Sequence, residues 1–99
     1  MAVGDAVLAQ SSINWDEYLT IQPASGDEYI ITNIWAEAEI EVYISDGVKD
    51  VQIEEMLIYP FSLNGYKWII SNSLYLKIKN ASSGATNGYI GYSGIKIKD

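Results

Sequence analysis

The stretch Ile21–Ser45, IQPASGDEYIITNIWAEAEIEVYIS, is the most clearly patterned part of this 99-residue chain, and it indicates the fold class. From residue 37 to residue 44, apolar side chains alternate with three glutamates and a tyrosine. A period of two residues predicts a half-buried β-strand. Residues 28–35, which are rich in β-branched and aromatic side chains, predict a preceding strand. We expect the two strands to form one unit with an apolar face and a carboxylate-lined face.

Turn signals divide the rest of the chain into short segments of the same kind. Asp46-Gly47 and Asn64-Gly65 each predict a β-hairpin, because glycine tolerates the positive φ of the tight turns that join paired strands. The polar segment 80–88 predicts a loop. No stretch has a helical period. The sequence therefore predicts an all-β fold: a small antiparallel β-sandwich, jelly-roll-like, with seven or eight strands.

Two further features concern the ends of the chain. In the last strand, Ile90 and Ile95 differ in parity, so we expect a β-bulge near Ser93-Gly94. At the other end, residues 1–12 predict an N-terminal arm or an edge strand, and residues 13–99 a single sandwich domain. The first residues make a poor secretory signal, because no base precedes their apolar part. No segment is long and apolar enough to predict a membrane span.

Charge is divided unevenly along the chain, whose formal net charge is −7. Residues 1–55 hold twelve acids and one lysine, whereas residues 56–99 hold five lysines and one acid. This division predicts charge pairs between strands of one sheet, or else between the faces of neighbouring subunits. We favour pairs within the chain, because cross-strand pairs are common. The acidic balance and the lack of arginine argue against nucleic acid as a partner.

The residue inventory excludes several classes of chemistry. The chain has no histidine, cysteine or arginine, which removes histidine-based nucleophile systems, thiolate and imidazole metal sites and guanidinium clamps. Glu37, Glu39 and Glu41 could serve glycoside hydrolysis or hold calcium. They point to the same side of one predicted strand, however, and a solvated strand face explains them better. We therefore expect no catalytic residues, no metal, no cofactor and no enzymatic activity.

Aromatic and apolar residues indicate two kinds of binding surface. Tyr18, Tyr43 and Tyr75 fall on outward parities and could stack on sugar rings, although aromatic residues are also favoured in strands and subunit contacts. Val3, Val7 and Leu8 form an apolar stretch with no hairpin partner beside it. Because monomers rarely leave large apolar patches in water, this stretch predicts a contact between subunits of a homo-oligomer.

Three stretches carry a resemblance to small structural proteins of tailed phages. They are the Pro-x-x-Gly turn, acids and strand of Gln22–Ile34, then Asn72–Asn80, then the closing strand Gly91–Lys98. The resemblance implies a virion protein that is made in the host cytoplasm, such as a capsid decoration, head-fibre or spike module. It also implies a homotrimer with the major capsid protein or another virion protein as partner. The aromatic residues leave an alternative, a carbohydrate-binding or receptor-binding module.

Overall fold

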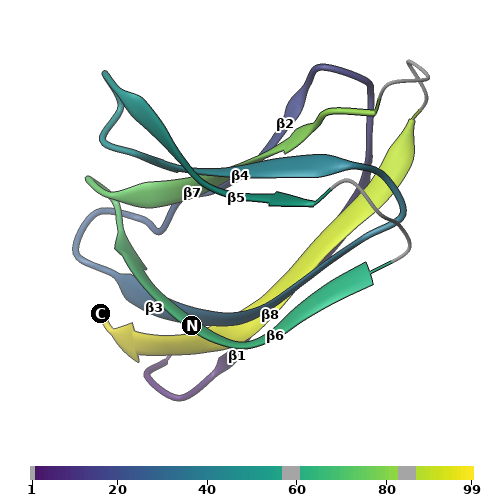
Figure 1. Cartoon of the computed structure of the whole chain (residues 1–99). Coiled ribbons are helices and arrows are strands. Elements are labelled where there is room, and N and C mark those ends of the chain that lie inside the picture. The colour runs from purple at the N-terminus through teal and green to yellow at the C-terminus, as the bar shows by residue number, and fades with distance from the viewer. Residues whose placement is uncertain (1, 57–60, 83–86) are drawn as a thin grey trace.

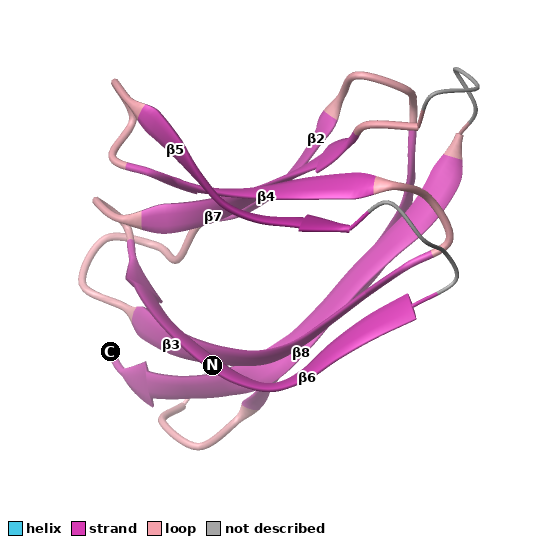
Figure 2. Ribbon diagram, viewed as in Figure 1, coloured by secondary structure: helices cyan, strands magenta, loops and turns pink. Residues whose placement is uncertain are grey.

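The computed structural model describes residues 2–56, 61–82 and 87–99, which form two antiparallel sheets packed face to face (Figure 1). Within these residues there is no helix, and strands dominate (Figure 2). The strands are β1 (Ala6–Ile13), β2 (Tyr18–Ile21), β3 (Glu28–Ala36), β4 (Ile40–Ser45), β5 (Asp50–Met56), β6 (Phe61–Ser71), β7 (Tyr75–Asn80) and β8 (Gly88–Lys98). The predicted all-β sandwich is confirmed.

The strand order is that of a jelly roll. Sheet 1 has the order β1-β8-β3-β6, and sheet 2 has the order β2-β7-β4-β5. Neighbouring strands are antiparallel throughout. The chain changes sheet at every connection except β4–β5, so strands that are close in sequence mostly face each other across the core.

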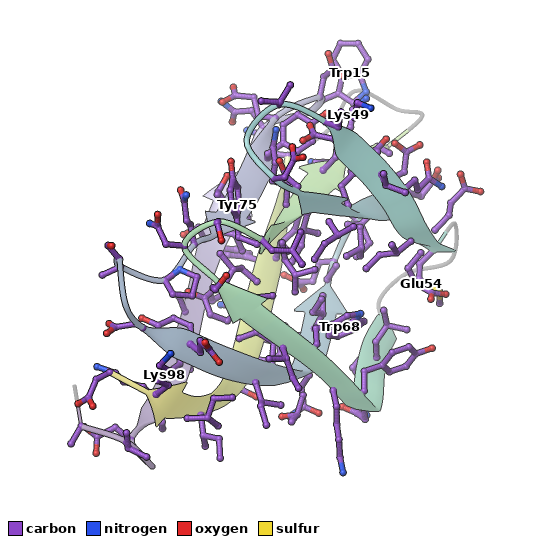
Figure 3. All side chains as sticks on the ribbon, turned by 90° about the vertical axis from the view of Figure 1, so that its left-hand side faces the viewer. Trp15, Lys49, Glu54, Trp68, Tyr75 and Lys98 are labelled. Atoms are coloured by element: carbon purple, nitrogen blue, oxygen red, sulfur yellow. The ribbon has the colours of Figure 1, made fainter. Side chains whose placement is uncertain are left out.

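The core between the sheets is built mainly of isoleucine. β-branched side chains pack well on the pleated surface of a sheet, and each sheet contributes its inward parity. Trp68, labelled in Figure 3, is partly buried against this core. The largest fully buried apolar side chains of the strands are Ile21, Ile31, Ile34, Ile40, Val42, Ile70, Leu76, Ile78 and Ile90.

The predicted pairing of residues 28–35 with residues 37–45 is wrong, although both segments form strands. β3 belongs to sheet 1 and β4 to sheet 2. The intervening corner is tied to both sheets, because the amide of Glu37 donates to the carbonyl of Tyr89 and the amide of Ala81 donates to the carbonyl of Glu39. Ala38, between the two glutamates, is 1% exposed. Alternation shows which side of each strand is apolar. It does not show whether two strands pair side by side in one sheet or face each other across the core.

Of the two predicted hairpins, one is confirmed. β4 and β5 pair directly across residues 46–49, where Gly47 has a φ of +91° and Asp46 Oδ1 accepts hydrogen bonds from two backbone amides. Asn64-Gly65, in contrast, lies inside β6, and the predicted hairpin there is wrong. Gly65 has a φ of +79° in a β-bulge opposite Thr32, so the glycine supplies the same conformation to a different structure.

The bulge predicted near Ser93-Gly94 is present at that level of the sheet, but it lies on the neighbouring strand β3 and not on β8. β8 pairs with β1 without interruption, and the extra residue at this level is Thr32 on β3. β8 therefore keeps its parity: Ile95 points outward, and Lys96 is buried with its Nζ 3.4 Å from Asp27 Oδ2. An isoleucine is expected at the inward position from its apolar side chain, but a paired lysine can occupy that position instead.

The N-terminal segment lies along the protein's own sheet. β1 is an edge strand that pairs with β8, and it extends from Ala6 to Ile13, across the predicted boundary after residue 12. Residues 83–86 of the predicted 80–88 loop lie outside the described residues.

Candidate functional site

Many of the acids of the chain belong to segments at one end of the sandwich, the end on the right in Figure 1. They come from the β1–β2 turn, the β3–β4 corner, β4 and β5. We call this set the acidic end: Asp16, Glu17, Glu37, Glu39, Glu41, Glu54 and Glu55. Among the described residues of this end, Lys79 is the one lysine, and its Nζ lies 3.0 Å from Asp16 Oδ1. Seven carboxylates and one lysine give the acidic end a formal charge of −6.

Asn80 holds the β1–β2 turn of the acidic end against the end of β7. Its backbone amide donates to the carbonyl of Glu17, and its carbonyl accepts from the amide of Asp16. Its buried side-chain amide donates to the carbonyl of Ile13 at 2.8 Å. Asp16 has a φ of 69°, a conformation that aspartate tolerates better than most residues. A single buried polar residue thus holds in place the backbone turn that carries two of the seven carboxylates.

The register of β4 and β5 brings further acids together. Glu41 lies directly opposite Glu55 on β5, and opposite Lys79 on its other side. Directly opposed like charges destabilise a sheet, so this arrangement costs stability at neutral pH. Glu41 also accepts a hydrogen bond from the hydroxyl of Tyr43. That bond, helped by burial, raises the pKa of Tyr43 to about 12.

The lysines of the second half of the chain mostly pair with acids of the first half. Lys77 Nζ lies 2.9 Å from Asp50 Oδ2, and the carboxylate holds the pKa of the lysine above its usual value. Hydrogen bonds from Ser45 and Lys77 lower the pKa of Asp50. Lys98 approaches Glu28 at 3.6 Å, at the end opposite the acidic end. Lysines of the second half therefore pair with acids of the first half within the chain, as we favoured. The excess of acids over lysines lies mainly at the acidic end.

The three tyrosines predicted to stack on sugars lie on the outer face of sheet 2. The rings of Tyr18 and Tyr43 meet edge to face at 6.0 Å. Lys77 Nζ lies 4.4 Å from the centre of the Tyr18 ring. Tyr75 is on β7, at the end of the same face where the hairpin turn joins β4 to β5. The rings are thus part of a network of charged side chains and do not form an uninterrupted aromatic platform.

The three residues predicted at a subunit contact separate into two groups. Val7 is 5% exposed and belongs to the protein's own core, so its side chain is not available to a neighbouring subunit. Val3 and Leu8 are exposed. Leu8 lies on the outer face of sheet 1, because it has the opposite parity to Val7, whose side chain points into the core.

Other features offer little chemistry. A polar depression of about 310 Å³ lies at the end opposite the acidic end and is lined by Ser25, Gly26, Asp27, Glu28, Ser71, Asn72, Ser73 and Lys98. Among the described residues, no group of three or more acids is arranged to hold a metal ion. No helix in the described part of the chain is long and apolar enough to cross a membrane.

Of the three glutamates predicted on one strand, Glu41 lies on β4, whereas Glu37 and Glu39 lie in the corner before it. The alternating pattern did not indicate Glu55 on β5, the partner of Glu41. A signal was present, because the Asp46-Gly47 turn fixes the register of the hairpin. Pairing Ser45 with Asp50 and counting outward, with one extra residue on β5, places Glu55 opposite Glu41. No such signal places Asp16 and Glu17 of the β1–β2 turn at the acidic end, because the position of this turn depends on β7, far along the chain.

Comparison with known proteins gives a likeness of fold. No protein-family model matches the chain, and no curated protein matches it. Among solved structures, the chain is similar to the core of Drosophila NLP, a nucleoplasmin-type protein whose crystal structure concerned pentamer formation and histone binding. The match has a TM-score of 0.50 and 16% sequence identity, and covers 94% of this chain and 99% of that chain. At this identity, the match shows the fold alone.

The function expected from the phage-like motifs is corrected by this finding. The matched protein is a pentameric histone-binding core, so it contradicts a capsid decoration or head-fibre module. The carbohydrate-binding or receptor-binding alternative, with its stacking residues Tyr18, Tyr43 and Tyr75, is not favoured either. The matched protein forms a homo-oligomer, which is consistent with self-association of this chain, but nothing supports a trimer or a capsid partner. What the comparison shows is a β-sandwich of the type seen in the nucleoplasmin core.

Proposed function

We propose that this chain is a non-enzymatic, self-associating module that binds a basic polypeptide through its acidic end. The observation that carries the proposal is the gathering of seven carboxylates from three separate stretches of the chain, residues 16–17, 37–41 and 54–55, around a single lysine. The opposite end has lysines beside its acids, with Asp27, Glu28 and Asp50 each paired to one. The charge of the molecule is therefore concentrated where a cationic partner could bind.

Physical chemistry favours a lysine-rich or arginine-rich segment as that partner. A surface of one sign raises the local concentration of ligands of the opposite sign and speeds their association. Pairing a partner's lysine with Glu55 would also relieve the opposition between Glu41 and Glu55. The similarity of fold supports a basic partner as well, because the similar NLP core is a histone-binding protein and histones are basic.

The arrangement of the acids supports a binding role over catalysis. Glycoside hydrolysis needs two carboxyl groups that face each other across a cleft. Here Glu41 and Glu55 stand side by side on the outer face of sheet 2, and the one described depression lies at the other end. The chain also has no histidine or cysteine to act as base or nucleophile.

The test is a titration of a labelled basic peptide, with histone-tail and polylysine sequences as probes, followed by fluorescence anisotropy at several salt concentrations. We expect binding that weakens steeply as salt rises, because screening acts on exposed charges. The variant Glu37→Gln/Glu55→Gln removes two charges from the acidic end. We expect it to bind about tenfold more weakly, from about 0.7 kcal/mol lost for each exposed pair.

The matched control removes two charges elsewhere. In Asp5→Asn/Asp46→Asn the net charge changes by the same amount, and asparagine can still accept the backbone hydrogen bonds at these positions. We expect this variant to bind like the unmodified protein. Equal weakening in both variants would mean that only net charge matters, and no binding of either probe at low salt would reject the proposed function.

A further inference from the structure

The outer face of sheet 1 has an unusual composition for so acidic a protein. The strand registers place one outward side chain beside the next in rows across all four strands. We call this surface the neutral face: Ala6, Leu8, Gln10, Ser12, Ile30, Asn33, Trp35, Ser62, Asn64, Ile69, Tyr89, Gly91, Ser93 and Ile95. None of these side chains is charged at neutral pH, although 19% of the chain's residues are. Charges at its border include Asp5 next to Ala6, the Glu28–Lys98 pair and Lys67 in the β6 bulge.

Apolar side chains on the neutral face are well exposed. Leu8 is 67% exposed, Ile69 60% and Ile95 45%. Ile69, Ile30, Ile95 and Ala6 form one row that crosses the sheet from β6 to β1. In Figure 2 no layer of the described chain covers this face, apart from the turn that precedes β1 at its edge. Contiguous exposed apolar surface of this kind marks a contact site in soluble proteins.

Trp35 makes the neutral face flat. Its indole lies over Gly91 of β8, where any Cβ atom would overlap the ring. Its Nε1 donates a hydrogen bond to Gln10 Oε1 on β1 at 2.8 Å. The ring is thus held along the sheet, across β3, β8 and β1, and does not project from it. A flat surface that is fixed in advance loses little side-chain entropy when a partner binds.

Charge identifies the partner. The outer face of sheet 2 carries Lys77, Lys79 and Glu41, and the acidic end carries a concentrated negative charge. A charged surface docked on the neutral face would lose water without gaining an opposite charge, which is costly. A second neutral face has no such cost. It also lets two copies of a −7 molecule meet without bringing their acidic ends directly together.

The area of the face fits a small, weak contact. Strands lie about 4.8 Å apart and rise about 3.3 Å per residue, so four strands over seven residues project to roughly 450 Å². Because side chains project from the sheet, the accessible area of the face is larger than this projected area. Standard interfaces bury about 800 Å² per partner and weak ones less than about 600 Å². We therefore expect a contact toward the smaller end of the range, with a two-fold axis through the face.

We propose that two copies of this chain meet through their neutral faces. The proposal rests on the self-association in the proposed function and names its surface. It includes Leu8, one of the residues expected at a subunit contact from the sequence, and excludes the buried Val7.

The test is the mass of the full chain by analytical ultracentrifugation from 1 to 200 µM. We expect an assembly with an even number of subunits, which dissociates on dilution. Leu8→Lys, at one edge of the face, and Ile69→Lys, at the other, place a charge in the contact. Each should raise the dissociation constant at least tenfold while lowering the net negative charge. Leu74→Lys is the matched control, because Leu74 is 48% exposed and lies in the β6–β7 turn, away from the face.

The outcomes separate this inference from the proposed function. Unchanged masses for both Leu8→Lys and Ile69→Lys, including a ring of five subunits, would overturn the neutral-face contact and leave self-association intact. A wild-type monomer at 200 µM would overturn the contact and the self-association, and would leave the face to a different partner. The peptide titration reports on the acidic end independently, and Leu8→Lys should bind the basic peptide as the wild type does. Circular dichroism establishes that each variant is folded.

Discussion

At the scale of single residues, Trp35 and Gly91 show how a side chain far along the chain explains a glycine. The φ of Gly91 does not lie in the left-handed region, so its backbone does not require glycine. The indole of Trp35 does require it, because a methyl group at position 91 would overlap the ring. The pair is therefore a steric unit, and its two members should be coupled energetically.

We predict that Gly91→Ala destabilises the protein by about 1–3 kcal/mol, as overpacking does. In a Trp35→Ala background the same substitution should cost less than about 0.5 kcal/mol, because the obstructing ring is gone. Urea denaturation of the four proteins in this cycle measures the coupling. Equal costs in both backgrounds would show that the backbone, and not the indole, needs the glycine.

Tyr43 and Glu41 give a second prediction at this scale, on pH dependence. The pKa of Tyr43 is raised to about 12, chiefly by its hydrogen bond to Glu41. A group whose pKa is higher when folded adds stability that is complete below its unfolded pKa of 10 and declines as pH rises toward 12. Tyr43→Phe should therefore be less stable than the wild type at pH 8, and this difference should shrink between pH 10 and pH 12. Denaturation series at these pH values test it; a difference that grows would contradict the hydrogen bond.

At the scale of single elements, the bulge of β6 illustrates that one dipeptide suits two structures. Asn64-Gly65 is typical of tight hairpin turns, yet here Gly65 serves an irregularity inside an eleven-residue strand. No atom of the residues that the structure describes lies within 4 Å of the position that a Cβ atom would take at Gly65. A side chain there would therefore meet conformational strain and no steric obstruction.

We predict that Gly65→Ala costs about 1 kcal/mol, because alanine disfavours a φ of +79°. Gly65→Asn should cost less, since asparagine tolerates the left-handed region. Guanidinium denaturation distinguishes the two variants. A smaller cost for alanine than for asparagine would mean that the bulge rearranges when the glycine is replaced.

At the scale of the whole molecule, charge is sorted by the fold into three different surfaces. The acidic end concentrates carboxylates, the outer face of sheet 2 mixes lysines with acids and tyrosines, and the neutral face has no charge. The first of these surfaces reduces stability, because like charges repel across β4 and β5. Binding sites often keep such unfavourable arrangements, since a partner relieves them.

We predict that Glu55→Lys stabilises the isolated protein by about 0.2–1 kcal/mol at low salt, because it faces Glu41 with an opposite charge. The gain should fall in 1 M NaCl, where screening shortens the range of the interaction to about 3 Å. The same variant should weaken binding of a basic peptide. Thermal melts at the two salt concentrations measure the first effect. A gain that does not depend on salt would show that repulsion was not its cause.

The sequence by itself determined the local properties of this protein. Alternation identified β4 and its inward side, and the charge division predicted that lysines of the second half of the chain pair with acids of the first half, as Lys77 and Lys98 do. Turn chemistry located the hairpin at Asp46-Gly47. These features follow from residues within a few positions of each other, or from charge attraction that acts in any arrangement.

The tertiary structure alone decided how the elements are combined. β3 and β4 belong to opposite sheets, Asn64-Gly65 is a bulge and Lys96 faces inward, because the pairing partners of β3 lie far along the chain, on β6 and β8, and outweigh local preference. The neutral face arises in the same way, because its members are scattered in sequence and the register of distant strands brings them onto one surface. The acidic end does so only in part: its β1–β2 turn is held by distant β7, whereas Glu41 and Glu55 meet within a local hairpin.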